Sequence, residues 1–197
     1  MQGDPKVIDY LNKGLRSELT AISQYWLHYR LLNNWGLLDM AKVWRKESIE
    51  EMEHADKFTD RILFLDGFPN LQVLDPLRIG QNVKEIIDCD LASEIAARTL
   101  YQEAAHYCQG VKDFVTRDLF ESLMKDEEHH IDFLETQLDL IKRIGLELYT
   151  QKHVGGLESE HCTLTSILER HLSPPVTAGL DSDSAAREFR AALHRRI

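Results

Sequence analysis

The sequence predicts an all-α fold in which four long helices form a bundle, with a long crossover between the second and third helices and a short fifth helix. Apolar residues recur at helical spacing through most of residues 1–156, and turn and cap residues divide this region into long stretches. An irregular segment, 70–81, separates the second stretch from the third and is long enough to cross the length of a bundle. Such a crossover would make the second and third helices parallel.

Local signals set the predicted bounds of the first two helices. The first is expected over Pro5–Asn33, because Asp4 is a good N-cap and proline suits the first helical position. A turn follows it. The second helix is expected to end at Asp66, before the breaker sequence Gly67-Phe68-Pro69.

Glycines mark the ends of the later helices. A third helix is expected over 83–109, before Gly110, and a fourth over 113–144, before Gly145. A short fifth helix is expected over 146–153.

The sequence changes character after Gly156, so the predicted organisation is a bundle domain, 1–156, followed by a C-terminal tail, 157–197. The tail contains Ser173-Pro174-Pro175 and a polar run, and we expect it to be loosely ordered, with one short helix compatible with 184–195. A docking peptide for another protein is the alternative.

The Glu-x-x-His motifs at Glu51–His54 and Glu127–His130 are the most informative feature of the chain. A glutamate and a histidine three residues apart lie on one face of a helix, so both can reach one metal ion. Each motif follows a lone glutamate in an apolar helical stretch by the same interval, 33 residues. A glutamate from each of two helices, with Glu-x-x-His from the other two, is how a four-helix bundle builds a carboxylate-bridged di-iron or di-manganese site. The six candidate ligands are Glu18, Glu51, His54, Glu94, Glu127 and His130.

An internal repeat supports this interpretation, because a shift of 76 residues superimposes the two halves beyond the ligands. The matched positions are Ser17-Glu18-Leu19 with Ser93-Glu94-Ile95, Tyr25 with Tyr101, Glu50 with Asp126, and Asp56 with Asp132. The alternative is that the candidate ligands lie on solvated helix faces. They instead occupy the apolar stripes of their helices, where unpaired carboxylates would be strongly destabilising.

The repeat also places a tyrosine two helical turns after each lone glutamate. Pseudo-twofold symmetry predicts that each hydroxyl group bonds the glutamate of the opposite half, so that Tyr25 bonds Glu94 and Tyr101 bonds Glu18. The alternative is that both are core aromatic residues whose hydroxyl groups meet water.

Composition and charge narrow the classes of function. The chain of 197 residues has a net charge of −10, which disfavours nucleic-acid binding and suits attraction of cations. No apolar run reaches the length of about eighteen residues that a membrane span needs, and the N-terminus shows no secretory signal. The three cysteines form no Cys-x-x-Cys pair, which favours reduced thiols and a cytoplasmic location.

Long ordered runs within residues 1–156 also match a known family. They include Leu11-Asn12-Lys13, Gln24-Tyr25, Asn34-Trp35-Gly36-Leu37, Glu47-Ser48-Ile49, Arg61-Ile62-Leu63-Phe64-Leu65 and Pro69-Asn70-Leu71-Gln72. These runs resemble the bacterioferritins, a haem-containing ferritin family. The resemblance implies a ferritin-like fold and a 24-subunit hollow shell, built from twofold dimers, that stores iron. It also implies a di-iron ferroxidase centre in each subunit and haem b between paired subunits.

The resemblance further implies that the two motif glutamates, Glu51 and Glu127, bridge the two iron ions, and that a lone glutamate and a histidine complete each ion. The terminal pairs are Glu18 with His54 and Glu94 with His130. The reaction would be oxidation of two Fe²⁺ by dioxygen or peroxide, since hard oxygen ligands favour Fe³⁺. The expected partners are Fe²⁺, an oxidant and further copies of the chain, with a ferredoxin-type reductant as a candidate and a hetero-oligomer as the alternative assembly.

Met52 lies in the stretch Glu51-Met52-x-His54-Ala55-Asp56, which resembles the bacterioferritin stretch whose methionine binds haem. On an ideal helix its side chain points away from Glu51 and His54, so it must face solvent or another subunit. Two symmetry-related Met52 residues would then hold one haem across a twofold interface. By itself, a lone helical methionine is more often a packing residue.

Three positions depart from the family pattern. Lys46 stands where family members often carry a histidine of an inner-surface iron site, with the acids here at Glu50 and Asp126. A protonated lysine cannot ligate iron, so the resemblance does not carry this site over. Phe58 and Phe133 stand where redox-active tyrosine and tryptophan occur in some members, so no electron relay is expected through them.

The alternative function is that of a di-iron oxidase or peroxidase that does not store iron. Rubrerythrin-like peroxidases usually add a Cys-x-x-Cys iron domain, and the sequence contains no such motif. Native mass and iron content, measured together, separate the two functions, because only a storage shell is both very large and rich in iron.

Overall fold

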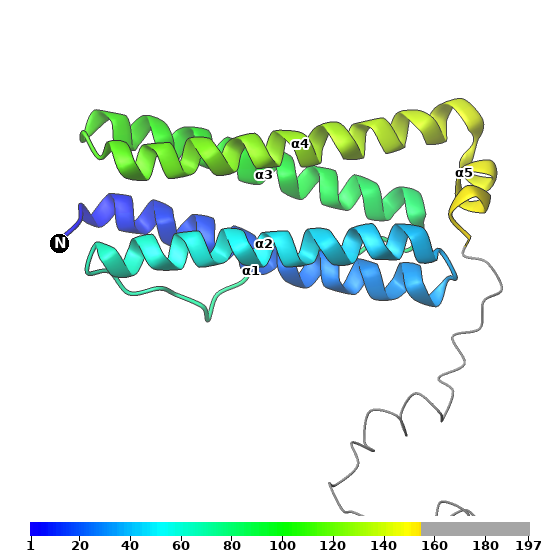
Figure 1. Cartoon of the computed structure of the whole chain (residues 1–197), viewed down its shortest axis with the longest axis horizontal. Coiled ribbons are helices and arrows are strands. Elements are labelled where there is room, and N and C mark those ends of the chain that lie inside the picture. Colours follow the sequence, from blue (N-terminus) through cyan, green and yellow to red (C-terminus); the bar gives the residue numbers. More distant parts are fainter. Residues whose placement is uncertain (155–197) are drawn as a thin grey trace, which may run out of the picture. The chain divides into compact units, whose positions relative to one another are not determined.

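Four long helices lie side by side and form a bundle, and a short fifth helix lies at one end of it (Figure 1). Their bounds are α1 Pro5–Asn34, α2 Leu38–Phe64, α3 Val83–Gly110, α4 Phe114–Ile144 and α5 Leu146–His153. The computed structural model describes residues 1–154, and these contain helices and connecting segments only. The predicted all-α fold is therefore confirmed, whereas the predicted tail, 157–197, lies outside the described residues.

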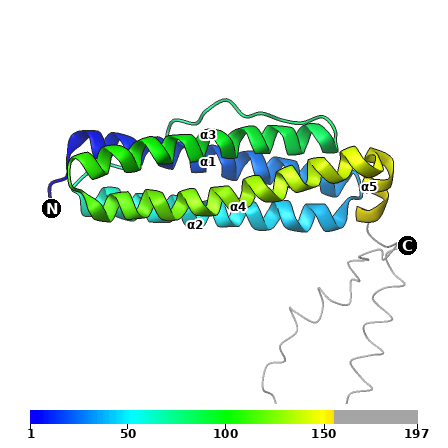
Figure 2. The same ribbon diagram turned by 90° about the horizontal axis from the view of Figure 1, so that it is seen from above.

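The two helical hairpins of the bundle correspond to the two halves of the sequence repeat. Helices α1 and α2 pack against each other as one antiparallel pair, and α3 and α4 form the second pair (Figures 1 and 2). Residues 65–82 run back along the outside of the bundle and connect the two pairs, so α2 and α3 are parallel, as predicted (Figures 1 and 2). Among the described helices, none is both long enough and apolar enough to cross a membrane.

Polar side chains cap the first turns of three long helices, and their interactions explain where these helices begin. Asp4 accepts hydrogen bonds from the backbone N–H groups of Lys6 and Val7, at 2.7 and 3.2 Å. Asn82 and Asp113 likewise accept from the third residue of α3 and α4, each at 3.0 Å. The second helix ends two residues before the predicted Asp66, because that residue has a φ of 56° and so leaves the helical region.

The crossover segment is tied to α1 by four hydrogen bonds from its backbone N–H groups. The pairs are Asn70 to the side chain of Asn12 (2.8 Å), Asp75 to Thr20 (2.9 Å), Arg78 to Gln24 (2.9 Å) and Gly80 to His28 (3.1 Å). Only glycine fits at position 80, since a Cβ atom there would lie 2.2 Å from the backbone nitrogen of Ile86. These bonds hold the irregular segment against α1 and give four of its backbone donors a partner.

Two apolar clusters fill the bundle, and a polar centre lies between them. Along α1, Leu15 belongs to the first cluster and Ala21 to the second, while the buried Glu18 lies between the two. Phe58 is a central member of the first cluster, and Trp44 of the second. The apolar packing on both sides holds the polar side chains of four helices in fixed positions.

Candidate metal centre

The four long helices bring all six candidate ligands together in the middle of the bundle. Their exposed fractions are 1% for Glu18, 0% for Glu51, 2% for His54, 2% for Glu94, 0% for Glu127 and 8% for His130. Glu18 comes from α1, Glu94 from α3, and one Glu-x-x-His motif comes from each of α2 and α4. The alternative of solvated helix faces is therefore wrong.

The six side chains form two overlapping groups of four, and in each group the candidate ligand atoms lie within 4.8 Å of one another. The first group is Glu18, Glu51, His54 and Glu127, and the second is Glu51, Glu94, Glu127 and His130. Only the two motif glutamates belong to both groups. Each group has the composition of one metal position, with oxygen atoms from three carboxylates and one imidazole nitrogen.

The carboxylates of Glu51 and Glu127 each direct one oxygen to each histidine. For Glu51, Oε2 lies 3.1 Å from Nδ1 of His54 and Oε1 lies 3.3 Å from Nδ1 of His130. For Glu127, Oε1 lies 3.6 Å from Nδ1 of His54 and Oε2 lies 3.3 Å from Nδ1 of His130. This arrangement suits two carboxylates that bridge a pair of metal ions.

Several of these atoms lack the hydrogen bonds that buried polar atoms normally make. Within the described residues, Oε1 of Glu51, both carboxylate oxygens of Glu127 and Nδ1 of His130 are buried without a hydrogen-bond partner. All four point into the centre, where metal ions would satisfy them. The residues present therefore fit a pair of metal ions.

The pKa shifts of the buried carboxylates also fit a metal site. Burial, followed by the charges of Glu51 and Glu127, raises the pKa of Glu18 well above its ordinary value. Burial, and after it the charge of Glu51, also raises the pKa of Glu127. The pKa of Glu51 is lowered although burial opposes this, because the imidazoles of His130 and His54 lie against its carboxylate and favour its ionised form. Some carboxylates of the metal-free centre thus hold protons that incoming metal ions would release.

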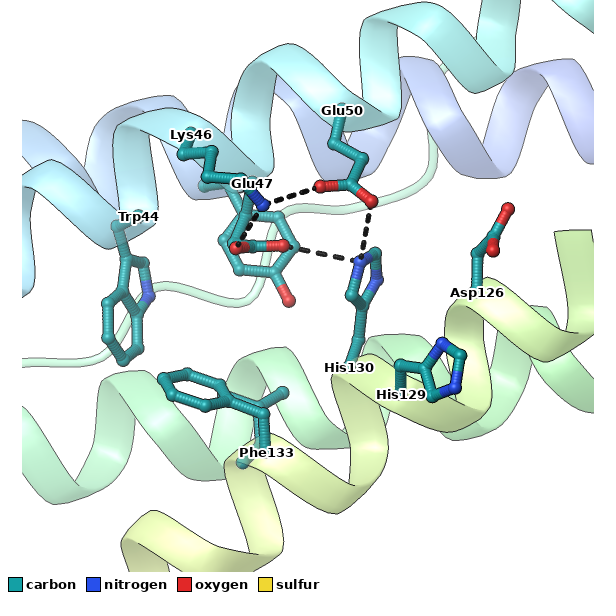
Figure 3. Close-up of a pocket in the computed structure, with 10 residues that line it drawn as sticks. Trp44, Lys46, Glu47, Glu50, Asp126, His129, His130 and Phe133 are labelled. Carbon is teal, nitrogen blue, oxygen red and sulfur yellow. Dashed lines mark hydrogen bonds and ion pairs between the residues drawn. The ribbon is translucent and has the colours of Figure 1, made fainter.

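Each histidine contacts a further carboxylate with its outward nitrogen, Nε2. Nε2 of His130 lies 3.2 Å from Oε2 of Glu47 and 3.8 Å from Oε1 of Glu50 (Figure 3), and Nε2 of His54 lies 3.5 Å from Oδ2 of Asp126. A carboxylate at this nitrogen favours the tautomer that leaves Nδ1 free for a metal, and it fixes the ring orientation. No ligand motif of the sequence includes Glu47, although its position one turn before Glu51 places it on the same helix face.

Lys46 lies where the family pattern would place an iron ligand, and it instead forms ion pairs. Its Nζ atom is 2.9 Å from Oε2 of Glu50 and 3.7 Å from Oε1 of Glu47 (Figure 3). The hydrogen bond to Glu50 raises the pKa of Lys46, so its ammonium group stays protonated. Glu47, Glu50 and His130 form a third group of candidate ligands, but the ammonium of Lys46 already occupies the two carboxylates.

Both predicted tyrosine hydrogen bonds are present. The hydroxyl group of Tyr25 donates to Oε1 of Glu94, and that of Tyr101 donates to Oε1 of Glu18. The two tyrosines are buried, so the alternative in which their hydroxyl groups meet water is wrong. The pair links α1 and α3 directly at the centre.

Met52, Phe58 and Phe133 lie outside the centre. Met52 is half exposed, with 50% of its surface accessible, and lies on α2 between the two inward-pointing ligands of that helix. Its predicted contact with haem stays a prediction. Phe58 is buried beside Tyr101, with 5.5 Å between ring centroids, while Phe133 lies at the edge of the bundle against Trp44.

Comparisons with known proteins agree with this geometry. A ferritin-like domain is matched by residues 8–144. A bacterioferritin of Brucella melitensis is 58% identical over 151 residues, which are 77% of this chain and 94% of that protein. A bacterioferritin of Rhodobacter capsulatus is 62% identical over 145 residues, which are 74% of this chain and 90% of that protein.

A solved structure is also similar. The structure of Rhodobacter capsulatus bacterioferritin matches with a TM-score of 0.80 and 57% identity, over 81% of this chain and 99% of that chain. That protein is described with a metal-free dinuclear site and a haem iron in a crystallographic special position. The bundle and its buried centre thus define a ferritin-like protein. Within this class, the chain belongs to the bacterioferritin family.

Proposed function

We propose that this protein stores iron and oxidises Fe²⁺ at the centre formed by Glu18, Glu51, His54, Glu94, Glu127 and His130. The observation that carries the proposal is the pair of overlapping ligand groups, in which Glu51 and Glu127 are shared. Two Fe²⁺ ions are the substrate, and dioxygen or peroxide is the oxidant. Two divalent ions would also neutralise the four buried carboxylates, which a metal-free bundle holds only by keeping protons on some of them.

The residues of the chain have distinct parts in this proposal. Glu51 and Glu127 bridge the two ions, and a terminal glutamate and a histidine complete each one. Oxygen ligands stabilise Fe³⁺ over Fe²⁺, which favours electron loss by the bound iron. Tyr25 and Tyr101 hold the terminal glutamates in place, and Glu47 and Asp126 orient the histidine rings.

Storage requires an assembly of many copies, and we propose a homo-oligomeric shell built from twofold dimers. The support is family membership, together with apolar side chains that α2 and the crossover leave exposed. These are Met52, Leu63, Phe64, Phe68, Leu71 and Leu74. Haem b, held by Met52 from two subunits, is the second proposed cofactor, and it would serve electron transfer to stored Fe³⁺.

Replacement of a bridging ligand tests the ferroxidase part. Glu51→Ala and Glu127→Ala should each nearly abolish rapid Fe²⁺ oxidation, followed as the growth of Fe³⁺ absorbance, while native mass stays that of the parent. A parent-like rate in either variant would contradict the assignment of bridges.

Native mass and iron content test the storage part. Iron retained in a very large particle after gel filtration supports storage. A small particle that turns over Fe²⁺ but retains little iron would instead support a di-iron oxidase or peroxidase.

A further inference from the structure

A second buried polar cluster lies beside the candidate metal centre, and Asp90 is its central residue. The Asp90 carboxylate accepts hydrogen bonds from Nε1 of Trp44 at 2.7 Å, Nε2 of Gln24 at 2.8 Å and Nδ1 of His28 at 2.9 Å. All four side chains are buried, with at most 1% exposed. We call these residues the Asp90 cluster, and the proposed function assigns them no part.

The hydrogen bonds around the cluster determine its charge. Nε2 of His28 accepts the backbone N–H of Gly80, so the proton of a neutral imidazole lies on Nδ1, facing Asp90. Oε1 of Gln24 accepts the backbone N–H of Arg78, so the amide directs its NH₂ group to Asp90. Every one of these partners of the carboxylate is a neutral N–H donor, and the proton of a neutral carboxyl group would find no acceptor among them. Asp90 is therefore a buried negative charge stabilised by neutral groups.

This charge lies close to one end of the metal centre. Asp90 precedes Glu94 by four residues on α3, which is one helical turn, or about 6 Å along the axis. The neighbouring residues Gln24 and Tyr25 of α1 bind these two acids, Gln24 to Asp90 and Tyr25 to Glu94. The end of the centre that contains Glu94 and His130 is thus next to a fixed anion.

Within residues 1–154, the opposite end has no counterpart of the Asp90 cluster. The shift of 76 residues that relates the two halves pairs the Asp90 cluster with apolar residues. The pairs are Asp90 with Gly14, Trp44 with Phe120, His28 with Ala104 and Gln24 with Leu100. No larger side chain fits at position 14, because a Cβ atom there would lie 2.6 Å from Cζ of Phe58. Phe58 in turn packs against Phe120, with ring centroids 5.3 Å apart.

We propose that the two metal positions are inequivalent, and that the position of Glu94 and His130 takes the first divalent cation. The reason is that the Asp90 carboxylate stabilises positive charge there. This inference rests on the proposed function, which supplies the two metal positions. The bridging glutamates contribute equally to both positions, and each position has one terminal glutamate and one histidine. The outer nitrogens of the histidines also contact carboxylates, Glu47 and Glu50 at His130 and Asp126 at His54. Those carboxylates pair with Lys46 and Lys57, whereas the Asp90 carboxylate is bound by neutral donors. In a buried site a charge at this range favours cation binding by on the order of tenfold.

The test uses Zn²⁺, which is not oxidised, and the metal-free full-length protein. Crystals are grown with one Zn²⁺ per subunit, and anomalous scattering gives the occupancy of each position. We expect the position of Glu94 and His130 to hold roughly ten times as much Zn²⁺ as the other. Equal occupancies, or a preference for the position of Glu18 and His54, would overturn the inference and leave the proposed function intact. Absence of Zn²⁺ from both positions would instead refute the metal centre itself.

Two kinds of variant test the part of Asp90. Asp90→Asn removes the charge at nearly constant shape and should bring the two occupancies close to equal. Trp44→Phe removes one hydrogen-bond donor but keeps the charge, so the preference should persist. A parent-like preference in Asp90→Asn, or its loss in Trp44→Phe, would show that the charge is not the cause. Asp90→Ser also removes the charge and introduces a smaller side chain. It replaces Asp90→Asn if circular dichroism shows that the Asn variant does not fold.

Discussion

The hydroxyl group of Tyr101 donates a hydrogen bond to the carboxylate of Glu18, across the bundle from α3 to α1. Burial, followed by the charge of Glu18, raises the pKa of Tyr101 well above its ordinary value, so the hydroxyl group remains a donor. The matching bond from Tyr25 to Glu94 shows that the twofold repeat of the sequence is also present in the contacts of the terminal glutamates.

Tyr101→Phe should therefore destabilise the metal-free protein by about 1 to 2 kcal/mol, because a buried carboxylate loses a hydrogen-bond donor. Fe²⁺ oxidation should also slow, since Glu18 is held less firmly. The free energy of unfolding in urea and the initial oxidation rate are the two measurements. Tyr107→Phe is the matched control, because the hydroxyl group of Tyr107 makes only a long bond of 3.4 Å to Asp4. Equal effects of both substitutions would contradict the role given to Tyr101.

Glu47→Gln should weaken Zn²⁺ binding to the metal-free protein by roughly tenfold to a hundredfold, because the ring of His130 loses the carboxylate that orients it. Isothermal titration calorimetry measures this change. Glu53→Gln provides the control, since Glu53 is an exposed glutamate of the same helix. Unchanged affinity in Glu47→Gln would mean that the contact with His130 has no influence on the metal.

Met52→Leu should lose the optical spectrum of haem with two methionine ligands while Fe²⁺ oxidation continues at the parent rate. The side chain of Met52 is half exposed and lies away from the buried centre, so the two functions should separate. Glu51→Ala should show the reverse behaviour, with haem retained and oxidation lost. Met124→Leu, at a partly buried position of the core, controls for the general effect of losing a methionine. Normal haem binding by Met52→Leu would exclude this residue as the ligand.

Asp113→Asn should lower stability at neutral pH by about 1 kcal/mol, and the difference from the parent should disappear in acid. Burial opposes ionisation of Asp113, but hydrogen bonds from Thr116 and the guanidinium of Arg61 prevail and lower its pKa. A carboxylate with a lowered pKa stabilises the fold above its unfolded pKa, which is about 3.9, and loses this contribution as the pH falls through the folded value. Urea unfolding between neutral and strongly acidic pH measures the difference. Asp118→Asn, at an exposed ion pair on the same helix, should show little change across the range.

Truncation after Gly156 should leave the native mass and the rate of Fe²⁺ oxidation unchanged. The tail carries no candidate ligand, and the predicted bundle is complete before it. A truncated protein that no longer assembles would show that the tail is structural.

The sequence by itself determined the helices and the candidate ligands, because both depend on spacing along the chain. A Glu-x-x-His motif fixes two side chains to one helix face in any packing, and the repeat of the motif required a second helix pair with the same geometry. The tyrosine bonds followed from the same symmetry. The ends of α1, α2 and α3 differed from prediction by one or two residues, since local backbone angles such as that of Asp66 decide where a helix stops.

Tertiary structure alone decided which residues support the centre from outside. His28 and Asp90 are 62 residues apart, and the periodicity of α1 and α3 shows only that both face inward, not that they meet. The contact also depends on the crossover, whose Gly80 fixes the tautomer of His28. Glu47 and Asp126 likewise reach the histidine rings only across the space between α2 and α4. Spacing along a helix sets the direction of a side chain, but its partner across the bundle depends on how the helices pack, which no local pattern encodes.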